Sequence, residues 1–340
     1  MTPIRIVDRH GRLLAACLAA AWLPVLPLTA AEEAGDFLGR WALTIPGGGA
    51  GWLEITREDG WFDGSILWGG GSVVPLDNVF FHDGRLHATR LREVKRKLPG
   101  GGERVQRVTE LLTARVAGDQ LELRRVNPRD NGEGVETAAF SGTRIPPLPP
   151  RPDLAAVRFG EPVVLFNGRD LAGWRLVEAG APNGWQVLGG NLANRPGQPH
   201  QRSGNLRTEA EFEDFNLRLE CMVPPRGNSG VYLRGIYEVQ VADSHGQPPN
   251  AHGMGGLYSR ITPTANPSKA PGEWQSLDIT LVDRHLTVIL NGVTIIDNQP
   301  VAGCTGGALW SDEFRPGPIL LQGDHGPVDY RNLVLRPVLR

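Results

Sequence analysis

Apolar and polar residues alternate in short runs along most of the chain, and the clearest run lies between Asn228 and Asp243. Alternation of this kind is typical of β-strands, because successive side chains of a pleated strand point to opposite faces. Gly235 interrupts the run and predicts a turn between two strands. One face of this hairpin is expected to be apolar, and the other to carry polar side chains that include Tyr232, Arg234, Glu238 and Gln240.

Charged, amide and aromatic side chains on one sheet face suit a carbohydrate ligand. Charged and amide groups bind hydroxyls, and aromatic side chains cover the face of a sugar ring. An antiparallel sheet that turns a polar face to water gives the same alternation. The pattern alone therefore leaves a binding site and a solvated face both open.

Short alternating runs also fill residues 36–145, where turns such as Asp59-Gly60 and Asp83-Gly84 separate them. Their spacing predicts a small antiparallel β-barrel or sandwich, and an up-and-down barrel of lipocalin type is the form we expect. Trp41, Trp52, Trp61 and Trp68 could line a sugar-binding surface, but such residues more often fill the core of a small β domain, which we favour.

A proline-rich linker at 146–158 follows, and its opening Pro146-Pro-Leu-Pro-Pro-Arg-Pro152 is too stiff to join a sheet interior. The second domain, 159–340, contains enough apolar runs for about ten or more strands, which call for two stacked antiparallel sheets. We therefore expect an all-β protein whose C-terminal domain is a jelly-roll sandwich with one concave face.

Composition narrows the class of partner. The 35 basic and 37 acidic side chains nearly cancel, so nothing favours a nucleic-acid partner. Only three lysines are present, at Lys95, Lys97 and Lys269, which leaves few candidates for Schiff-base chemistry. A small carbohydrate is the partner that the polar strand faces predict.

The first 31 residues have the features of a signal peptide. Arg5, Arg9 and Arg12 precede an apolar stretch at 13–28, and Thr29-Ala-Ala31 forms a small-residue cleavage site. A lipobox-like Leu14-Ala-Ala-Cys17 is a weaker alternative that would anchor the chain through a lipid. No later segment is long and apolar enough to span a bilayer. The mature chain is therefore expected in the periplasm or outside the cell.

Two cysteines remain after cleavage, and Cys221 and Cys304 could form a disulfide or stay as free thiols. The glycine-rich stretch from Asp243 to Gly256 contains His245 and His252, but their spacing matches no strong ligand motif. No metal and no cofactor is expected, and a flexible rim is the favoured interpretation of this stretch.

Several sequence segments of the second domain, taken in order, resemble the 3-keto-disaccharide hydrolase family over about residues 160–340. They are Leu165-Phe-Asn-Gly-Arg-Asp-Leu-Ala-Gly-Trp174, Asp214-Phe-Asn-Leu-Arg-Leu-Glu220, Gly227-Asn-Ser-Gly-Val-Tyr-Leu-Arg234, Tyr237-Glu-Val-Gln-Val-Ala-Asp243, Gly272-Glu-Trp-Gln275, Leu290-Asn-Gly292, Gly317-Pro-Ile-Leu-Leu-Gln-Gly-Asp-His325 and Tyr330-Arg-Asn332. The resemblance implies a concanavalin-like β-sandwich in an exported bacterial protein that acts on glycosides oxidised to a ketone at carbon 3.

Such a ketone acidifies the hydrogen on carbon 2, so a base can expel the glycosidic oxygen by β-elimination, and water then adds to the unsaturated sugar. The reaction needs a base, a stabiliser for the enolate oxygen and an acid for the leaving group. Glu238 and His325 are the predicted acid and base in either order, and Arg234 is the predicted stabiliser. The predicted substrate-binding residues are Asn228, Tyr232, Gln240, Asp243, Tyr258, Trp274 and Gln322.

Two alternatives remain open. The segment from Glu238 to Asp243 is similar to the Glu-x-Asp-x-x-Glu strand of laminarinase-type retaining glycosidases, but Gln240 replaces the middle acid and Asp243 should face away from Glu238. A retaining glycosidase is therefore disfavoured. A carbohydrate-binding module without catalysis is the second alternative, because the same sandwich serves lectins as well as enzymes.

Overall fold

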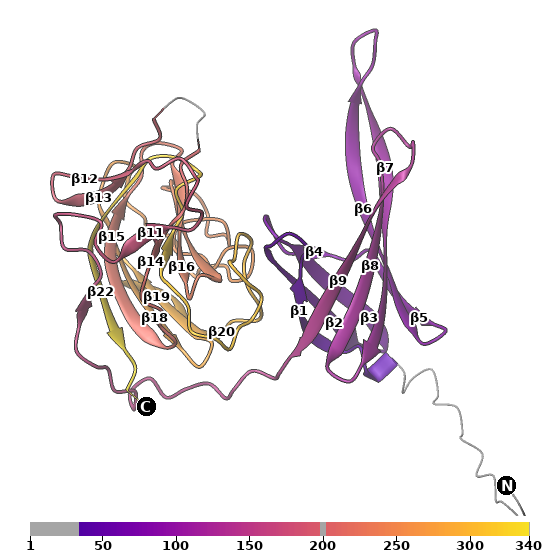
Figure 1. Ribbon diagram of the computed structural model, residues 1–340, viewed down its shortest axis with the longest axis horizontal. Helices are drawn as coiled ribbons and strands as arrows, with labels where there is room; N and C mark the ends of the chain where they lie inside the picture. Colours follow the sequence, from indigo (N-terminus) through magenta and orange to yellow (C-terminus); the bar gives the residue numbers. More distant parts are fainter. Residues whose placement is uncertain (1–33, 198–201, 340) are drawn as a thin grey trace, which may run out of the picture.

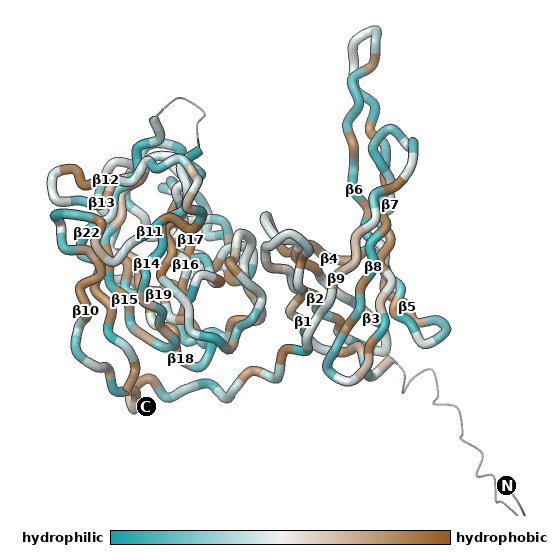
Figure 2. The backbone as a smooth tube through the Cα atoms, in the orientation of Figure 1, coloured by the Kyte–Doolittle hydropathy of each residue, from teal (hydrophilic) through white to brown (hydrophobic). Residues whose placement is uncertain are grey.

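The computed structural model describes residues 34–197 and 202–339, so the predicted signal peptide lies outside the described residues. Within this part of the chain nearly all regular structure is β-strand, which confirms the all-β prediction (Figure 1). No helix there has the length and apolar character that a membrane span requires. Hydropathy alternates along many strands, as expected for sheets with one buried face (Figure 2).

The N-terminal unit is one nine-stranded antiparallel sheet with the strand order β4-β3-β2-β1-β9-β8-β7-β6-β5. Its strands are β1 (Gly39–Thr44), β2 (Ala50–Glu58), β3 (Trp61–Trp68), β4 (Val74–Pro75), β5 (Asn78–His82), β6 (Arg85–Lys97), β7 (Glu103–Ala117), β8 (Gln120–Pro128) and β9 (Val135–Ile145).

This order is that of an up-and-down barrel opened at one seam. Each strand pairs with its neighbour in sequence, and β1 pairs with β9, but β4 and β5 form the two edges. The edge strand β4 has two residues, one of which is Pro75, and proline cannot donate to a ladder. The sheet thus curls into a half-barrel whose edge strands β4 and β5 do not pair with each other. This confirms the predicted small antiparallel β unit, but the barrel is not closed as expected for a lipocalin type.

The interior of the half-barrel is filled by apolar side chains that include Trp41, Leu53 and Phe140. Trp41 and Trp52 are buried, whereas Trp61 is 79% exposed. Two of these tryptophans thus fill cores, as expected, and Trp61 lies on the surface at the start of β3.

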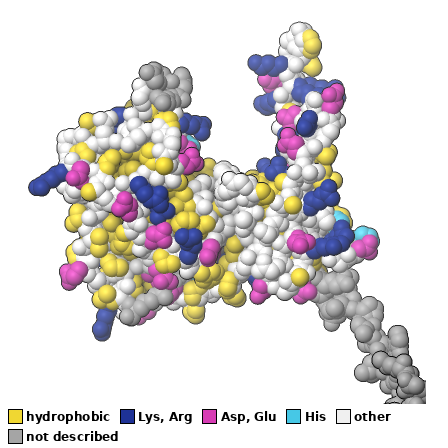
Figure 3. Space-filling model, viewed as in Figure 1, with side chains coloured by type: hydrophobic (Ala, Val, Ile, Leu, Met, Phe, Trp, Pro, Cys, Tyr) yellow, Lys and Arg dark blue, Asp and Glu magenta, His cyan; other side chains and the backbone are white. Residues whose placement is uncertain are grey.

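Strands β6 and β7 form a long hairpin that projects away from the rest of the molecule (Figure 1). Basic and acidic side chains are interspersed along it (Figure 3). Arg92 pairs with Asp130 at 2.5 Å, and Arg107 pairs with Glu93 at 3.5 Å. The basic residues of this hairpin therefore lie on a solvated surface of mixed charge rather than in a patch of one sign: Arg90, Arg92, Lys95, Arg96 and Lys97.

The proline-rich linker follows without joining either sheet. Its end is held by the second domain, because Asn298 donates to the carbonyl of Pro152 at 2.9 Å and Arg151 pairs with Asp297 at 3.2 Å. These contacts attach the end of the linker to the surface of the second domain (Figure 1).

Two antiparallel sheets form that domain. The larger contains β12 (Trp185–Leu188), β13 (Asn191–Asn194), β22 (Val328–Pro337), β15 (Phe215–Met222), β18 (Gln275–Val282), β19 (His285–Leu290) and β20 (Val293–Pro300), with β10 (Val163–Val164) on β22. The smaller has the order β11 (Trp174–Leu176), β14 (Leu206–Thr208), β21 (Leu320–Leu321), β16 (Asn228–Leu233) and β17 (Tyr237–Ala242). Apolar faces of both sheets pack together, which confirms the two-sheet sandwich.

The sandwich core extends into the first domain. Ala50, Trp52, Leu67 and Ile145 belong to the same cluster of buried apolar residues as the strands of the second domain. The Arg260 guanidinium lies over the Trp52 ring, 4.3 Å from its centroid. The two domains therefore meet through a junction of packed apolar side chains and not through the linker alone.

Cys221 and Cys304 are both buried and free. Of the two possibilities open from the sequence, the structure has the free thiols.

Candidate active site

A pocket of about 270 Å³ opens on the five-stranded sheet. This volume lies just below the ~300–1,000 Å³ typical of small-molecule sites, which suits about one sugar ring. Its lining is mostly polar, and comes from β16, β17, the loop after β21 and loops of both domains: Gly70, Gly71, Arg202, Asn205, Asn228, Tyr232, Glu238, Gln240, Tyr258, Gly306, Gly307, Gln322, Asp324 and His325.

The β16–β17 hairpin supplies the centre of the pocket. Tyr232 lies directly opposite Glu238 in the antiparallel register, and Gly230 lies opposite Gln240. A side chain at position 230 would collide with the catalytic candidate, since its Cβ would lie 2.3 Å from Oε1 of Glu238. The alternation of the sequence therefore places the polar side chains on one face, and Gly230 leaves the room that the Glu238 carboxyl group occupies.

Glu238 is only 3% exposed, and burial raises its pKa to about 8, although the hydrogen bond that Tyr232 can donate to the ionised carboxylate lowers it. The Tyr232 hydroxyl lies 2.8 Å from Oε2 of Glu238 and 2.8 Å from the carbonyl oxygen of Gly306. A carbonyl can only accept, and the hydroxyl has one proton to donate. Both contacts are satisfied when Glu238 is protonated and donates to the tyrosine oxygen, so the geometry agrees with a carboxylic acid at neutral pH.

Asp324 and His325 form a second titrating pair at the same pocket. The Nδ1 atom of His325 lies 2.7 Å from Oδ1 of Asp324, so the histidine donates from Nδ1 to the carboxylate. This hydrogen bond raises the pKa of His325, against the opposing effect of burial. Burial also opposes ionisation of Asp324, but His325, a backbone N–H and the charge of Arg202 together outweigh it, and the pKa of Asp324 is lowered. An imidazole oriented by a carboxylate in this way is a typical proton-transfer group.

Amide side chains line the same pocket with free acceptor capacity. Gln240 donates through Nε2 to Oδ1 of Asn228 at 3.0 Å. The side-chain oxygens of Gln240 and Gln322 are buried and have no hydrogen-bond partner among the described residues. Buried polar atoms normally have partners. Two unpaired acceptors in one pocket therefore suit the hydroxyl groups of a bound sugar.

Six of the predicted residues other than Glu238 line this pocket: His325, Asn228, Tyr232, Gln240, Tyr258 and Gln322. Tyr258 packs edge to face against His252 with ring centroids 4.7 Å apart. The structure thus brings together residues from β16, β17, the 243–258 segment and the loop after β21.

Arg234 does not reach the pocket. Strand β16 ends at Leu233, and Arg234 has a positive φ of 54°, so the alternation that was expected to place it beside Tyr232 stops one residue earlier. Its guanidinium donates instead to the carbonyls of Glu313 and Arg315, each at 2.6 Å through Nη2. We therefore leave Arg234 out of the chemistry proposed below.

Trp274 and Asp243 also lie outside the pocket lining. The Arg331 guanidinium covers the Trp274 ring, 4.0 Å from its centroid. Asp243 follows the end of β17 and accepts a hydrogen bond from the backbone N–H of Arg226 at 2.8 Å. Asp243 thus caps a loop, and it does not form the second carboxylate beside Glu238 that a retaining glycosidase of laminarinase type would need.

Several lining residues were not predicted from the sequence. Asp324 adjoins His325 in the turn Gly323-Asp-His-Gly326, and a carboxylate next to a candidate base was a usable signal. Arg202 and Asn205 precede β14, and Gly70 and Gly71 belong to the N-terminal domain. No local pattern marks these four, because the fold brings them from distant parts of the chain.

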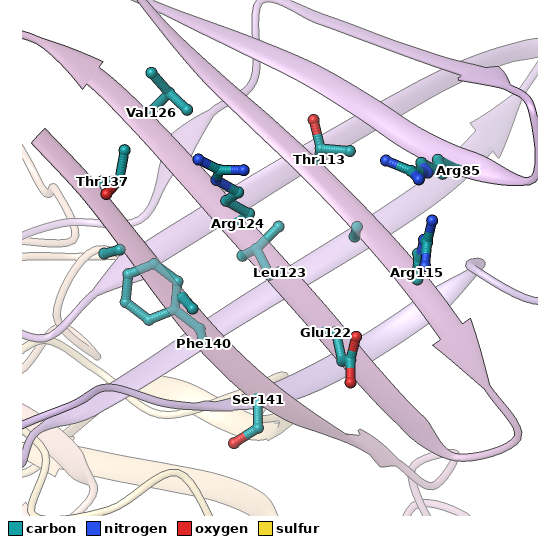
Figure 4. Close-up of a pocket in the computed structure, with 13 residues that line it drawn as sticks. Arg85, Thr113, Arg115, Glu122, Leu123, Arg124, Val126, Thr137, Phe140 and Ser141 are labelled. Atoms are coloured by element: carbon teal, nitrogen blue, oxygen red, sulfur yellow. The ribbon is translucent and has the colours of Figure 1, made fainter. Parts of the chain in front are cut away.

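A larger hollow of about 780 Å³ lies on β7, β8 and β9 of the N-terminal sheet (Figure 4). Arg85, Arg115, Arg124 and Glu122 are among its lining residues (Figure 4). No cluster of three or more His, Cys, Asp or Glu suited to a metal is found in the part of the chain that the structure describes. Glu238, Asp324 and His325, whose pKa values are shifted, all line the smaller pocket.

A two-sheet sandwich with an acid, a histidine–carboxylate pair and free amide acceptors in one pocket defines the class of carbohydrate-active β-sandwich proteins. Residues 161–336, more than half of the chain, match the family model of the 3-keto-α-glucoside-1,2-lyase-like domain. The chain belongs to this 3-keto-disaccharide hydrolase family, as the resemblance predicted. No curated protein matches the chain.

Solved structures with similar folds include a Parabacteroides distasonis protein that carries the provisional name of glycosyl hydrolase. It is 31% identical, with 57% of this chain and 93% of that chain covered and a TM-score of 0.43. A carbohydrate-binding module CBM66 from Bacillus subtilis is 14% identical, with coverage of 49% and 97% and a TM-score of 0.34. The endo-β-1,3(4)-glucanase SCLam of family GH16 is 10% identical, with coverage of 56% and 92% and a TM-score of 0.34.

Proposed function

We propose that this protein is an exported enzyme that cleaves the glycosidic bond of 3-keto-disaccharides or 3-keto-glycosides by elimination followed by hydration. The observation that carries the proposal is one pocket that holds both a buried carboxyl group with a pKa of about 8 and a histidine bonded to a carboxylate. One group is protonated at neutral pH and the other is poised to accept a proton. Elimination needs this combination.

In the proposed reaction neutral His325 removes the proton from carbon 2, and the electron pair forms the enolate of the carbon 3 ketone. The enolate re-forms the ketone as the bond between carbon 1 and the glycosidic oxygen breaks, which leaves a double bond between carbons 1 and 2. Protonated Glu238 gives its proton to the departing oxygen. Water then adds at carbon 1, and carbon 2 recovers a proton.

Asp324 keeps the imidazole oriented through Nδ1 and leaves Nε2 as the titrating nitrogen. Gln240 and Gln322 accept hydrogen bonds from sugar hydroxyls through their unpaired oxygens. Arg202, an arginine at the pocket wall, supplies the positive charge that the enolate oxygen requires. Tyr258 and Tyr232 provide aromatic surface beside the sugar.

A carbohydrate-binding module without catalysis is the second candidate, and the unpaired glutamine oxygens would serve it equally. What favours the enzyme is the cost of burying Glu238. A binding site has no need of a carboxyl group whose pKa is raised to about 8, whereas a general acid at neutral pH does.

The test is to incubate the purified mature chain with 3-keto-trehalose and with trehalose in heavy water and to follow the products by NMR. We expect cleavage of the keto sugar alone, with deuterium at carbon 2 of the product. Cleavage of trehalose would favour a conventional glycosidase. Binding of either sugar without any product would favour the binding module.

A further inference from the structure

The N-terminal domain reaches the pocket through its glycine-rich loop at residues 69–73, between β3 and β4. Gly70 and Gly71 are pocket-lining residues although they lie far from the second domain in sequence. Both are exposed, whereas Glu238, Gln240 and Tyr232 are buried. The loop therefore lies at the mouth of the pocket, and Glu238, Gln240 and Tyr232 lie at its floor.

Contacts on both sides hold this loop in place. The N–H of Gly307 donates to the carbonyl of Gly69 at 3.0 Å. The N–H of Val73 donates to Oγ of Ser259 at 2.9 Å, and Oγ of Ser72 lies 2.9 Å from Nε2 of His252. The loop is thus bonded to the two segments of the second domain that flank it.

The same two segments also hold the catalytic candidates. The carbonyl of Gly306 accepts a hydrogen bond from the Tyr232 hydroxyl, and Oγ1 of Thr305 accepts one from the N–H of Glu238 at 2.9 Å. On the other side, the N–H of Tyr258 donates to the carbonyl of Glu238 at 2.9 Å. The 69–73 loop therefore hydrogen-bonds to the same two segments of the second domain that position Tyr232 and Glu238.

The backbones approach so closely that only glycine fits at the contact. A Cβ at Gly306 would lie 2.0 Å from the carbonyl oxygen of Gly71. Gly71 has a φ of 88°, which L side chains rarely adopt. The wall at this point consists of peptide backbone, whose N–H and C=O groups suit hydroxyl groups and whose missing side chains keep the mouth open.

We propose that the 69–73 loop forms part of the subsite for the leaving group and sets the size of leaving group that the enzyme accepts. The inference rests on the proposed function for its substrate. With the keto sugar held at the floor by Glu238 and the glutamines, the group attached to carbon 1 must project toward the mouth and along the loop. The first domain then acts as a specificity element for the sandwich that carries the reacting groups.

Gly70 offers a clean probe of this subsite. It lacks a positive φ, and a Cβ built on it meets no atom within 4 Å, so a side chain there should fold without strain and occupy the mouth. Gly100 has the same two properties but lies at the exposed turn of the β6–β7 hairpin, outside the pocket lining. Gly70→Leu and Gly100→Leu are therefore matched variants of the full chain.

The experiment compares kcat/KM for 3-keto-trehalose, whose leaving group is a sugar, with kcat/KM for methyl 3-keto-α-glucoside, whose leaving group is methanol. We expect Gly70→Leu to lose at least about tenfold on the disaccharide and less than about threefold on the methyl glycoside, with Gly70→Ala in between. Gly100→Leu should match the wild type on both. Equal losses on both substrates, or no loss on either, would overturn the subsite assignment.

A binding measurement tests the subsite separately from the proposed reaction. If the wild type cleaves neither keto sugar, NMR titrations with trehalose and with methyl α-glucoside replace the rates. Weaker binding of the disaccharide alone by Gly70→Leu would keep the subsite and reject the enzyme. Binding unchanged by the variant would reject the subsite, and a wild type that binds neither sugar would reject both.

Discussion

Tyr232 and Glu238 are cross-strand partners, and their side chains meet on the pocket face with the hydroxyl 2.8 Å from Oε2. This pairing follows directly from the two-residue period of the hairpin. It buries a carboxyl group that lines the pocket and whose Oε1 occupies the room left by Gly230. The protonation state of Glu238 is therefore the property on which most of the testable behaviour depends.

Activity should follow a bell-shaped pH profile. The acidic limb reports protonation of His325, whose pKa is raised above its ordinary 6.5 by Asp324, since the proposed base must be neutral. The alkaline limb reports loss of the Glu238 proton at a pKa of about 8. Measurement of kcat/KM from pH 5 to 10 checks this. A rate that keeps rising past pH 9 would remove Glu238 from the role of acid.

Asp324→Asn should shift the acidic limb toward lower pH, and the alkaline limb by a smaller amount in the same direction, because the charge of Asp324 also raises the pKa of Glu238. The hydrogen bond and the negative charge of Asp324 both raise the pKa of His325, so their loss lowers it. We also expect a lower maximal rate, by up to about 10⁴-fold, because the imidazole loses its orienting carboxylate. Asp312→Asn, a change at an acidic residue that is not in the pocket lining, is the control and should leave the profile unchanged.

Glu238→Gln should abolish turnover and stabilise the fold at alkaline pH. The pKa of Glu238 rises from an ordinary 4.5 to about 8 on folding, so the folded state retains a proton that the unfolded state has lost. Its contribution to stability is complete below pH 4.5 and is lost as the pH rises through about 8. The variant should therefore exceed the wild type above pH 8 by about 3–5 kcal/mol in the free energy of unfolding, at ~1.4 kcal/mol per pKa unit.

Urea unfolding of both proteins at pH 4.5 and pH 9 tests this expectation. Burial raises the pKa of Glu313 to about 7, so Glu313 also makes the free energy of unfolding depend on pH. This dependence is the same in both proteins and cancels in their difference. A difference between variant and wild type that stays constant with pH would mean that folding does not raise the pKa of Glu238.

Gln322→Met should weaken sugar binding without loss of stability. The oxygen of Gln322 is buried without a partner among the described residues, and its Nε2 makes only a 3.5 Å contact with the Tyr232 hydroxyl. An apolar side chain of similar length removes an unpaired polar group, which is neutral or stabilising by up to about 1–3 kcal/mol. NMR titration should show a dissociation constant raised by roughly tenfold, the effect of losing about 1.4 kcal/mol. Unchanged affinity would exclude Gln322 from hydroxyl binding.

The sequence predicted the pocket best where the backbone is regular. Period-two alternation was enough to place Tyr232, Glu238 and Gln240 on one face of the hairpin, because β16 and β17 keep their register throughout. It misplaced Arg234, because the left-handed conformation that starts the turn occurs at that residue and not at Gly235 alone. Local patterns contain no information on which residue first leaves the strand conformation.

The remaining differences concern contacts between distant segments. Trp274 was expected beside a sugar but is covered by Arg331 from β22, which no local pattern could indicate. Gly70 and Gly71 join the pocket only because the first domain docks against the second. The docking depends on side chains such as Trp52. The alternating pattern around Trp52 predicted that this face of the sheet is buried, but not which residues cover it.

Trp52→Ala tests this docking. Trp52 is 2% exposed, its ring lies under the Arg260 guanidinium, and it belongs to the core cluster shared with the second domain. Truncation of a buried tryptophan costs about 3–5 kcal/mol, so we expect a loss of that size in the free energy of urea unfolding. Trp61→Ala, in the same domain but 79% exposed, should change it by less than about 0.5 kcal/mol.

Since the shared core couples both domains, unfolding followed by fluorescence and by the NMR signals of the second domain should shift together in Trp52→Ala. A shift confined to one domain would mean that the two cores are energetically independent and that the 69–73 loop is held by its own hydrogen bonds alone.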